Sequence, residues 1–201
     1  MRRLLLLTAV LTLHACSILD LQDPFEKESN NTSLYLQKRG AQLLDLQNWS
    51  IEGRVGFRFK NQAWHASMYW EQQSSNFKLA LYDLFGRKIA EVFGDSHQTI
   101  LRTKEGEEYS APDSQVLLRK YFGFSFPVHG MRYWLMGISS PNSKVSELSF
   151  NKSGLPDILV QDGWRISYIG YDVYQRIKLP SRIQFNKENL ELKIAVKNWN
   201  L

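Results

Sequence analysis

Apolar and polar residues alternate with a period of two along most of the chain after residue 48. In the first run, one set of alternate positions consists of Ile51, Gly53, Val55, Phe57 and Phe59. The positions between them include the charged residues Glu52, Arg54 and Arg58. Successive side chains of a strand point to opposite faces, so this pattern predicts antiparallel strands with one apolar face.

Short runs of the same kind recur to the end of the chain. They lie at residues 64–70, 77–81, 89–93, 99–103, 107–110, 145–150, 157–161, 164–168, 181–185 and 190–199. Together the runs predict roughly ten or eleven strands. There is no internal repeat that would indicate a second domain.

Three segments break this alternation and favour helices. Residues 34–46 carry a rough stripe of leucines at helical spacing. A helix is expected to begin after Pro112-Asp113 and to stop at Gly123, and a second short one to occupy residues 128–136. The chain is therefore predicted to be mainly β within the α+β class. A strongly curved antiparallel sheet, or incomplete barrel, would have a few helices covering its open side.

The first fifteen residues have the parts of a secretory signal peptide. Arg2 and Arg3 precede an apolar run of about ten residues, whereas a membrane-spanning helix needs roughly 20. Ala15-Cys16 closes a segment that resembles the lipobox of bacterial lipoproteins, and Cys16 is the only cysteine. We expect residues 1–15 to be removed and Cys16 to be lipidated. The alternative is an ordinary signal peptide with a stray cysteine.

Residues 16–33 are rich in Asp, Glu, Asn and Ser, which is typical of a tether between lipid and domain. Ser17, next to the lipidated cysteine, is compatible with export to the outer membrane. Loss of Arg2 and Arg3 with the signal lowers the formal net charge from +5 to +3, which is too small to favour nucleic acid. Residues 34–201 are expected to form one domain that acts as a monomer.

The sequence gives no positive support to catalysis. His65, His97 and His129 lie far apart, without the close spacing typical of zinc sites. There is no Gly-x-Ser-x-Gly elbow and no phosphate-binding glycine loop. Cys16 would be consumed by lipidation. We therefore expect no catalytic residue, no metal and no cofactor.

One predicted turn carries apolar residues where polar ones are usual. Leu84 and Phe85 stand between Asp83 and Gly86, which suit a turn. An exposed Phe costs about 1.5–3 kcal/mol unless it meets something apolar, and the basic residues at 87 and 88 could meet lipid phosphates. The alternative is that Phe85 folds back under a neighbouring helix.

Several short pieces, in this order and spacing, resemble the LolB family of outer-membrane lipoprotein receptors. The pieces are Gly53, Tyr69-Trp70-Glu71-Gln72, Leu84-Phe85-Gly86, Tyr109-Ser110-Ala111-Pro112-Asp113, Trp134-Leu135-Met136-Gly137, Gln161-Asp162-Gly163-Trp164, Tyr168 with Gly170-Tyr171-Asp172, Leu179-Pro180 and the strand at 192–199. The resemblance runs from about residue 49 to 199 and includes the signal and lipobox.

The resemblance implies a non-enzymatic function at the outer membrane. Members of the family accept lipoproteins from the periplasmic carrier LolA and place them in the inner leaflet of the outer membrane. It implies an incomplete barrel with an apolar cavity for acyl chains. The expected partners are LolA, acylated client lipoproteins and outer-membrane phospholipid. The domain would be lipid-anchored and face the periplasm.

The resemblance also assigns roles to particular residues. The family's protruding loop usually reads Pro-Leu-Gly, so Phe85 corresponds to the exposed Leu and Leu84 stands where Pro is usual. Leu84, Phe85 and Gly86 are therefore the expected membrane-insertion loop. The candidate residues of the cavity wall are Phe57, Trp70, Leu79, Leu81, Trp164 and Ile166. Each would serve equally well in a filled core.

Two other classes of function stay open from the sequence. A scaffold or assembly lipoprotein of the outer membrane would have a filled core and bind no acyl chain. A lipid-modifying hydrolase would need a Ser or Asp beside a His at the mouth of the cavity.

Overall fold

The computed structural model describes residues 38–141 and 143–201. The expected signal peptide, the tether and Cys16 lie outside these residues. The described part of the first expected helix spans residues 38–44.

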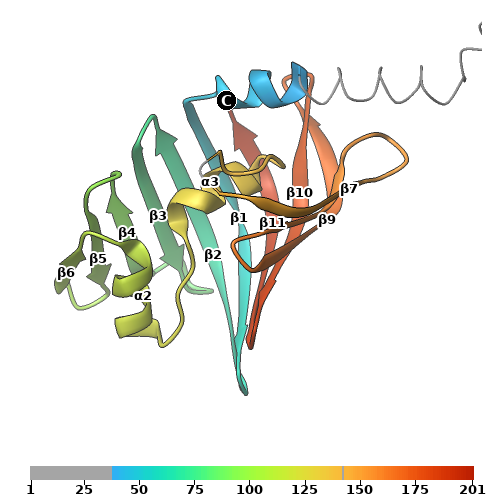
Figure 1. Ribbon diagram of the computed structural model, residues 1–201. Coiled ribbons are helices and arrows are strands. Elements are labelled where there is room, and N and C mark those ends of the chain that lie inside the picture. The colour runs from blue at the N-terminus through green and yellow to red at the C-terminus, as the bar shows by residue number, and fades with distance from the viewer. Residues whose placement is uncertain (1–37, 142) are drawn as a thin grey trace, which may run out of the picture.

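Eleven strands form one antiparallel sheet, which confirms the predicted fold class (Figure 1). The strand order is β6-β5-β4-β3-β2-β1-β11-β10-β9-β8-β7. The first and last strands of the chain therefore meet in the middle of the sheet, while β6 and β7 are its edges and the barrel stays open. The strands are β1 (Asn48–Phe59), β2 (Gln62–Gln73), β3 (Asn76–Tyr82), β4 (Lys88–Gly94), β5 (Thr99–Thr103), β6 (Glu108–Ala111), β7 (Val145–Phe150), β8 (Pro156–Gln161), β9 (Trp164–Tyr174), β10 (Ile177–Lys187) and β11 (Leu190–Asn200).

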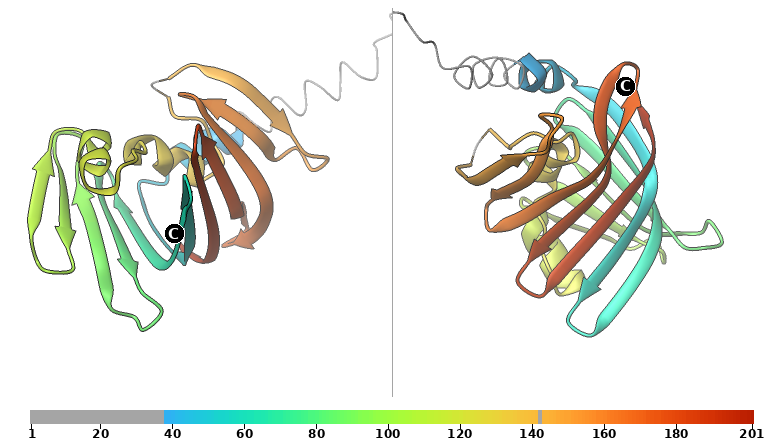
Figure 2. Two further views of the ribbon diagram at one scale, coloured as in Figure 1. Left: turned by 90° about the horizontal axis from the view of Figure 1, so that it is seen from below. Right: turned by 90° about the vertical axis from the view of Figure 1, so that its right-hand side faces the viewer.

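Two helices, α2 (Ser114–Phe122) and α3 (Val128–Leu135), lie against the concave side of the curved sheet (Figure 2). Asp113 begins α2 as expected, because its carboxylate accepts a hydrogen bond from the Gln115 backbone N–H. Gly123 ends α2 in the left-handed conformation, with φ of 78°. The predicted start and stop signals thus act where the sequence places them.

Strands β9 and β10 are longer than the sequence pattern indicates, because their hairpin pairing continues beyond the apolar core. The turn between them is formed by Gln175 and Arg176, whose φ angles are 46° and 69°. Positive φ at both central residues is typical of a two-residue hairpin turn. These positions usually carry Asn or Gly, so Gln175 and Arg176 are not recognisable as a turn from their residue types.

The core under α3 is filled by large aromatic side chains. Trp134 of α3 is fully buried and lies with its ring centroid 6.3 Å from that of Trp164. The buried Gln161 amide accepts a hydrogen bond from Trp134 Nε1 at 2.8 Å and donates to the Ser140 carbonyl at 2.8 Å. These bonds satisfy polar groups that burial would otherwise leave unpaired, so they fix α3 on the sheet.

Arg39 ties the first helix to the rest of the domain. Its guanidinium donates hydrogen bonds to the carbonyls of Met136 and Gly137, just after α3, and to that of Lys178 on β10. Leu43 of the same helix is fully buried in the core. The helix therefore belongs to the domain.

Candidate functional site: an apolar pocket and an exposed loop

An apolar pocket of about 520 Å³ lies on the concave face, between the sheet and α2. Its size is within the range of ~300–1,000 Å³ that is usual for sites of small ligands. The lining residues are Phe57, Gln62, Trp64, His65, Ala66, Leu79, Leu81, Ile89, Val92, Leu118, Tyr121, Phe122, Phe124 and Phe126. Most of them are aliphatic or aromatic, so the pocket favours an apolar ligand over a charged one.

Three large apolar side chains of the lining reach solvent. Trp64 is 45% exposed, Phe122 is 38% exposed and Ile89 is 36% exposed. Such exposure is costly in water at about 25 cal/mol per Å² of apolar surface. These three residues give the pocket an apolar edge from which a chain could enter.

The structure separates the six candidate cavity residues into two groups. Phe57, Leu79 and Leu81 line the pocket. Trp70, Trp164 and Ile166 do not line it. They are at most 2% exposed and belong to the packed core. All six lie on apolar strand faces, as the alternation predicts.

The core position of Trp70 has a clear physical cause. Its ring lies 6.2 Å from that of Trp49 and 6.3 Å from that of Phe77, and its Nε1 donates to the Gln72 side chain. Phe77 in turn makes an edge contact with His129 of α3. Residues under α3 therefore fill the concave face, whereas those facing α2 leave it hollow.

Part of the pocket wall comes from a segment that the sequence reasoning did not single out. Phe122 is the last residue of α2, Phe124 and Phe126 follow it, and the rings of Phe124 and Phe57 lie 5.8 Å apart. The sequence does contain a signal for this segment. An aromatic residue occurs at every second position on both sides of Gly123, where the helix ends. An aromatic run outside a helix or sheet needs an apolar surface to cover.

Leu84 and Phe85 form the tip of the loop between β3 and β4. They are 87% and 84% exposed, so Phe85 does not fold back under a helix. The Gly86 N–H donates to the Asp83 carbonyl at 3.1 Å, and Gly86 takes φ of 78°. The tip is thus a tight turn with two bare apolar side chains.

The carboxylate of Asp83 holds this turn together. Its Oδ1 accepts hydrogen bonds from the backbone N–H groups of Phe85 at 2.8 Å and Arg87 at 3.0 Å, and Oδ2 accepts one from Arg87 Nε at 2.7 Å. The hydrogen bond from the Arg87 backbone is the main cause that lowers the pKa of Asp83. The carboxylate is therefore charged at neutral pH and orders the loop.

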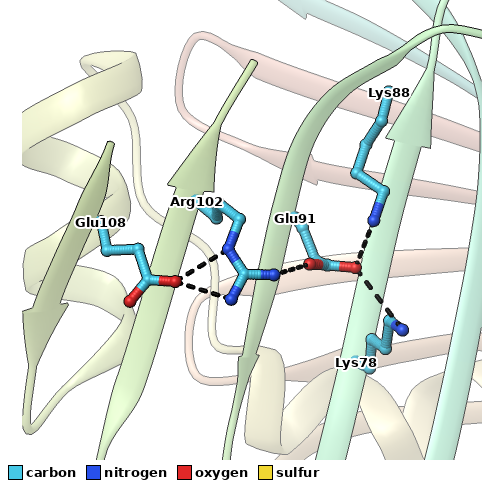
Figure 3. Close-up of polar contacts among 5 residues, drawn as sticks. All are labelled: Lys78, Lys88, Glu91, Arg102 and Glu108. Atoms are coloured by element: carbon cyan, nitrogen blue, oxygen red, sulfur yellow. Dashed lines mark hydrogen bonds and ion pairs between the residues drawn. The ribbon is translucent and has the colours of Figure 1, made fainter. Parts of the chain in front are cut away.

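A charged cluster braces the base of the same hairpin on the outer, convex face of the sheet (Figure 3). Glu91 on β4 is only 3% exposed and meets Lys88 at 2.8 Å, Lys78 at 3.5 Å and Arg102 at 2.8 Å. Arg102 also binds Glu108 on β6 at 2.6 Å. The cluster links β3, β4, β5 and β6, so it fixes the strands that carry the loop.

A register shift in β4 lets the neighbouring residues Lys88 and Ile89 point to opposite faces of the sheet. Leu81 pairs with Ala90 while Tyr82 pairs with Lys88, so Ile89 is an extra residue in β4. Lys88 can therefore reach Glu91, three positions later, on the convex face. Ile89 meanwhile lines the pocket on the concave face.

The loop and the helices lie on opposite sides of the sheet. In Figure 2, the green β3–β4 loop extends from the convex side, at the bottom of the left view and at the right of the right view, away from α2 and α3. Ile89 connects the two features because it follows the loop and lines the pocket. Loop and pocket edge are therefore joined by a few residues of one strand.

Within the described ranges, no three His, Cys, Asp or Glu residues are grouped so as to hold a metal ion. None of the helices in that part of the chain is long and apolar enough to cross a bilayer.

The open, curved sheet with helices on its concave side defines the half-barrel class of fold, and solved structures share it. The chain is similar to a putative outer-membrane lipoprotein-sorting protein domain from Vibrio parahaemolyticus, with a TM-score of 0.57 and 8% identity over 82% of this chain and 89% of that one. It is also similar to a LolA superfamily protein from Nitrosomonas europaea, with a TM-score of 0.50 and 7% identity over 81% and 93%.

Sequence comparison gives the family within that class. The family model described as "Outer membrane lipoprotein LolB" matches residues 47–199. The chain is 32% identical to the outer-membrane lipoprotein LolB of Francisella tularensis subsp. tularensis (strain FSC 198) over 98% of this chain and 93% of that protein. It is 30% identical to that of Halorhodospira halophila over 96% and 92%. The chain therefore belongs to the LolB family, which places it at the outer membrane as a lipoprotein.

Proposed function

We propose that this protein accepts lipoproteins from the periplasmic carrier LolA, holds an acyl chain in its apolar pocket, and releases the lipoprotein into the outer membrane. The observation that carries the proposal is the hollow of about 520 Å³ beside α2. Each methylene group that moves from water into such a hollow contributes about 0.8 kcal/mol. An acyl chain would therefore bind without any covalent chemistry.

Delivery needs a contact with the membrane, and Leu84 and Phe85 supply one. Both are exposed in water, where a large apolar side chain gains about 1.5–3 kcal/mol on transfer to an apolar phase. Because Ile89 follows this loop and lines the pocket edge, insertion of the tip keeps that edge within a few residues of the lipid. The acyl chain can then leave one apolar environment for another.

The two alternative classes of function receive less support. A scaffold lipoprotein was expected to have a filled core, whereas the concave face beside α2 is hollow. A hydrolase was expected to have a Ser or Asp beside a His at the mouth of the cavity. His65 is among the residues that line the pocket, but its side chain faces Gly56 on the convex side, and no Ser, Asp or Glu is among the described residues that line the pocket.

The acyl-binding step can be tested with a substitution at the pocket edge. Ile89→Asp places a carboxylate where the chain would enter, and because Ile89 is 36% exposed the fold should tolerate it. Desolvating that charge should weaken the binding of a fluorescent fatty acid roughly tenfold or more. Val116→Asp is the matched control, since Val116 is 60% exposed on α2 and does not line the pocket. If both variants bound the fatty acid with the same affinity as the unmodified protein, the pocket would not be the acyl-binding site.

A further inference from the structure

The convex face carries a second hollow, of about 560 Å³, which we call the convex groove. It crosses β2, β1, β11 and β10 in the middle of the sheet. The polar side chains that line it on this face include Arg54, Arg58, His65, Arg182, Glu191 and Lys193, and Leu84 and Ile169 lie at its borders. It lies on the side from which the β3–β4 loop extends (Figure 2).

Small residues keep the floor of the convex groove low. Gly56 pairs with His65 on β2 and with Lys193 on β11, and a Cβ at Gly56 would stand 3.1 Å from His65 Nδ1. Ala63, Ser67 and Ala195 occupy nearby positions of the same face. Longer side chains therefore stand around a depression.

The walls of the convex groove are strongly basic. Arg54, Arg58, Arg182 and Lys193 face a single carboxylate, that of Glu191. Glu191 pairs with Lys193 at 3.1 Å and with Arg58 at 3.6 Å. Two of the four cations are unpaired, since Arg54 and Arg182 make no ion pair within the part of the chain that the structure describes.

The position of Arg182 is set by a neighbouring glycine. Its guanidinium lies over Gly170 on β9, where a Cβ would come within 2.9 Å of Arg182 Nε. Arg54 lies on the other side of β11, because both Arg54 and Arg182 pair with Ala195. Arg54 and Arg182 therefore flank the same position of the sheet, and their unpaired guanidinium groups suit an oxyanion with several acceptor oxygens.

The borders of the convex groove are apolar. Leu84, from the loop, is 87% exposed, and Ile169, from β9, is 56% exposed. A soluble phosphate ion would make no use of these two side chains. Cations beside exposed aliphatic side chains are typical of proteins that bind the surface of an anionic membrane.

We propose that the convex groove binds the phosphodiester headgroup of an anionic phospholipid through Arg54 and Arg182, while Leu84 and Ile169 contact the apolar layer below it. This inference rests on the proposed function, because it names the membrane partner of the delivery step. It also orients the molecule, with the convex face near the β3–β4 loop toward the bilayer.

The test compares two double variants of the mature chain in which Cys16→Ala removes the protein's own lipid. Arg54→Gln with Arg182→Gln removes the two unpaired cations of the groove. Lys152→Gln with Arg176→Gln removes the same amount of charge from exposed turns outside the groove. Binding is measured by sedimentation with vesicles of phosphatidylcholine alone and with added phosphatidylglycerol.

We expect vesicles that contain phosphatidylglycerol to bind the unmodified protein more tightly than neutral vesicles. The groove variant should bind them roughly 25-fold more weakly, since each of the two basic groups near such a surface contributes about fivefold. The control variant should change binding by less than about threefold, because Lys152 and Arg176 lie outside the groove. Equal binding by the groove variant and the control would overturn the proposal.

Two further measurements separate the other occupants. If inorganic phosphate displaced the vesicles at millimolar concentration, the groove would be a site for free phosphate and the proposal would be wrong. If the groove variant lost only uptake of lipoprotein from LolA, the ligand would be an acidic protein surface instead. Selective binding of phosphatidylglycerol by a protein that accepts no lipoprotein would support the groove and contradict only the proposed function.

Discussion

Asp83 shows how one side chain can replace a constraint of the backbone. The resemblance to the LolB family implies a Pro where this chain has Leu84, and a Pro would restrict the turn directly. Here the Asp83 carboxylate accepts two backbone N–H groups and the Arg87 side chain instead. The Arg87 guanidinium also lies 5.3 Å from the Phe85 ring centroid. The apolar tip is therefore held by hydrogen bonds and a cation–π contact.

Phe85→Glu should separate delivery from acceptance. The variant should take lipoprotein from LolA as before, because Phe85 does not line the pocket. Transfer from the protein to liposomes should slow by roughly tenfold or more. The variant loses the free energy of about 1.5–3 kcal/mol that an apolar side chain gains when it enters the membrane. Val173→Glu, at a residue 63% exposed on β9, is the control. An unchanged rate of delivery would show that the tip does not insert.

Glu91 should make the stability of the domain depend on pH. Burial by itself raises the pKa of Glu91, but the hydrogen bond and charge of Lys88, with Lys78 and Arg102, lower it overall. The ion pairs therefore stabilise the fold above the ordinary glutamate pKa of about 4.3, and this contribution is lost as pH falls through the lowered value.

Glu91→Gln should reduce the free energy of unfolding at pH 7 by about 1–2 kcal/mol, because its cationic partners are 42–48% exposed and partly screened. Urea unfolding at a series of pH values measures the difference from the unmodified protein. The difference should shrink below the ordinary glutamate range. Glu188→Gln, at an exposed turn residue, should change little. A difference that is the same at every pH would contradict the role of the Glu91 charge.

At the scale of elements, the alternation of side chains was sufficient to predict most strands and the apolar face of each. It could not tell Trp70 from Leu79, because both lie on the concave face and only one meets the pocket. That difference depends on α3, whose Trp134 and His129 fill one half of the face. The convex groove was equally out of reach, because pairing of β1 with β11 brings Arg54 near Arg182.

Strands β1 and β11 approach each other so closely at one glycine that adding a single methyl group there should destabilise the fold. At Gly53 a Cβ would stand 2.4 Å from the Ala195 carbonyl oxygen, at a register shift between the two strands. Gly53→Ala should therefore lower the midpoint of urea unfolding, with a cost of about 1–3 kcal/mol. Gly40→Ala, in the first helix with nothing within 4 Å, should instead be neutral or stabilising by up to about 1 kcal/mol. Equal stability of both variants would show that β1 and β11 can move apart at Gly53 without a measurable cost.

At the scale of the whole molecule, the two faces of one sheet have different proposed roles, acyl binding and membrane contact. The concave face holds the apolar pocket, and the convex face carries the loop and the basic groove. Lipidation at Cys16, which lies outside the described residues, is proposed to hold this domain beside the membrane. A form that begins at Ser17 should therefore still accept lipoprotein, although its delivery would be less selective for the outer membrane. Failure of that form to accept would give the anchor a part in acceptance itself.

The transfer of a labelled lipoprotein tests the central claim most directly. LolA loaded with the labelled lipoprotein is mixed with this protein, and liposomes are added afterwards without ATP. The account predicts that the label moves first to this protein and then to the liposomes, because each step gives the acyl chains a more favourable apolar environment. Label that stays with LolA, or that reaches the liposomes equally fast without this protein, would contradict it.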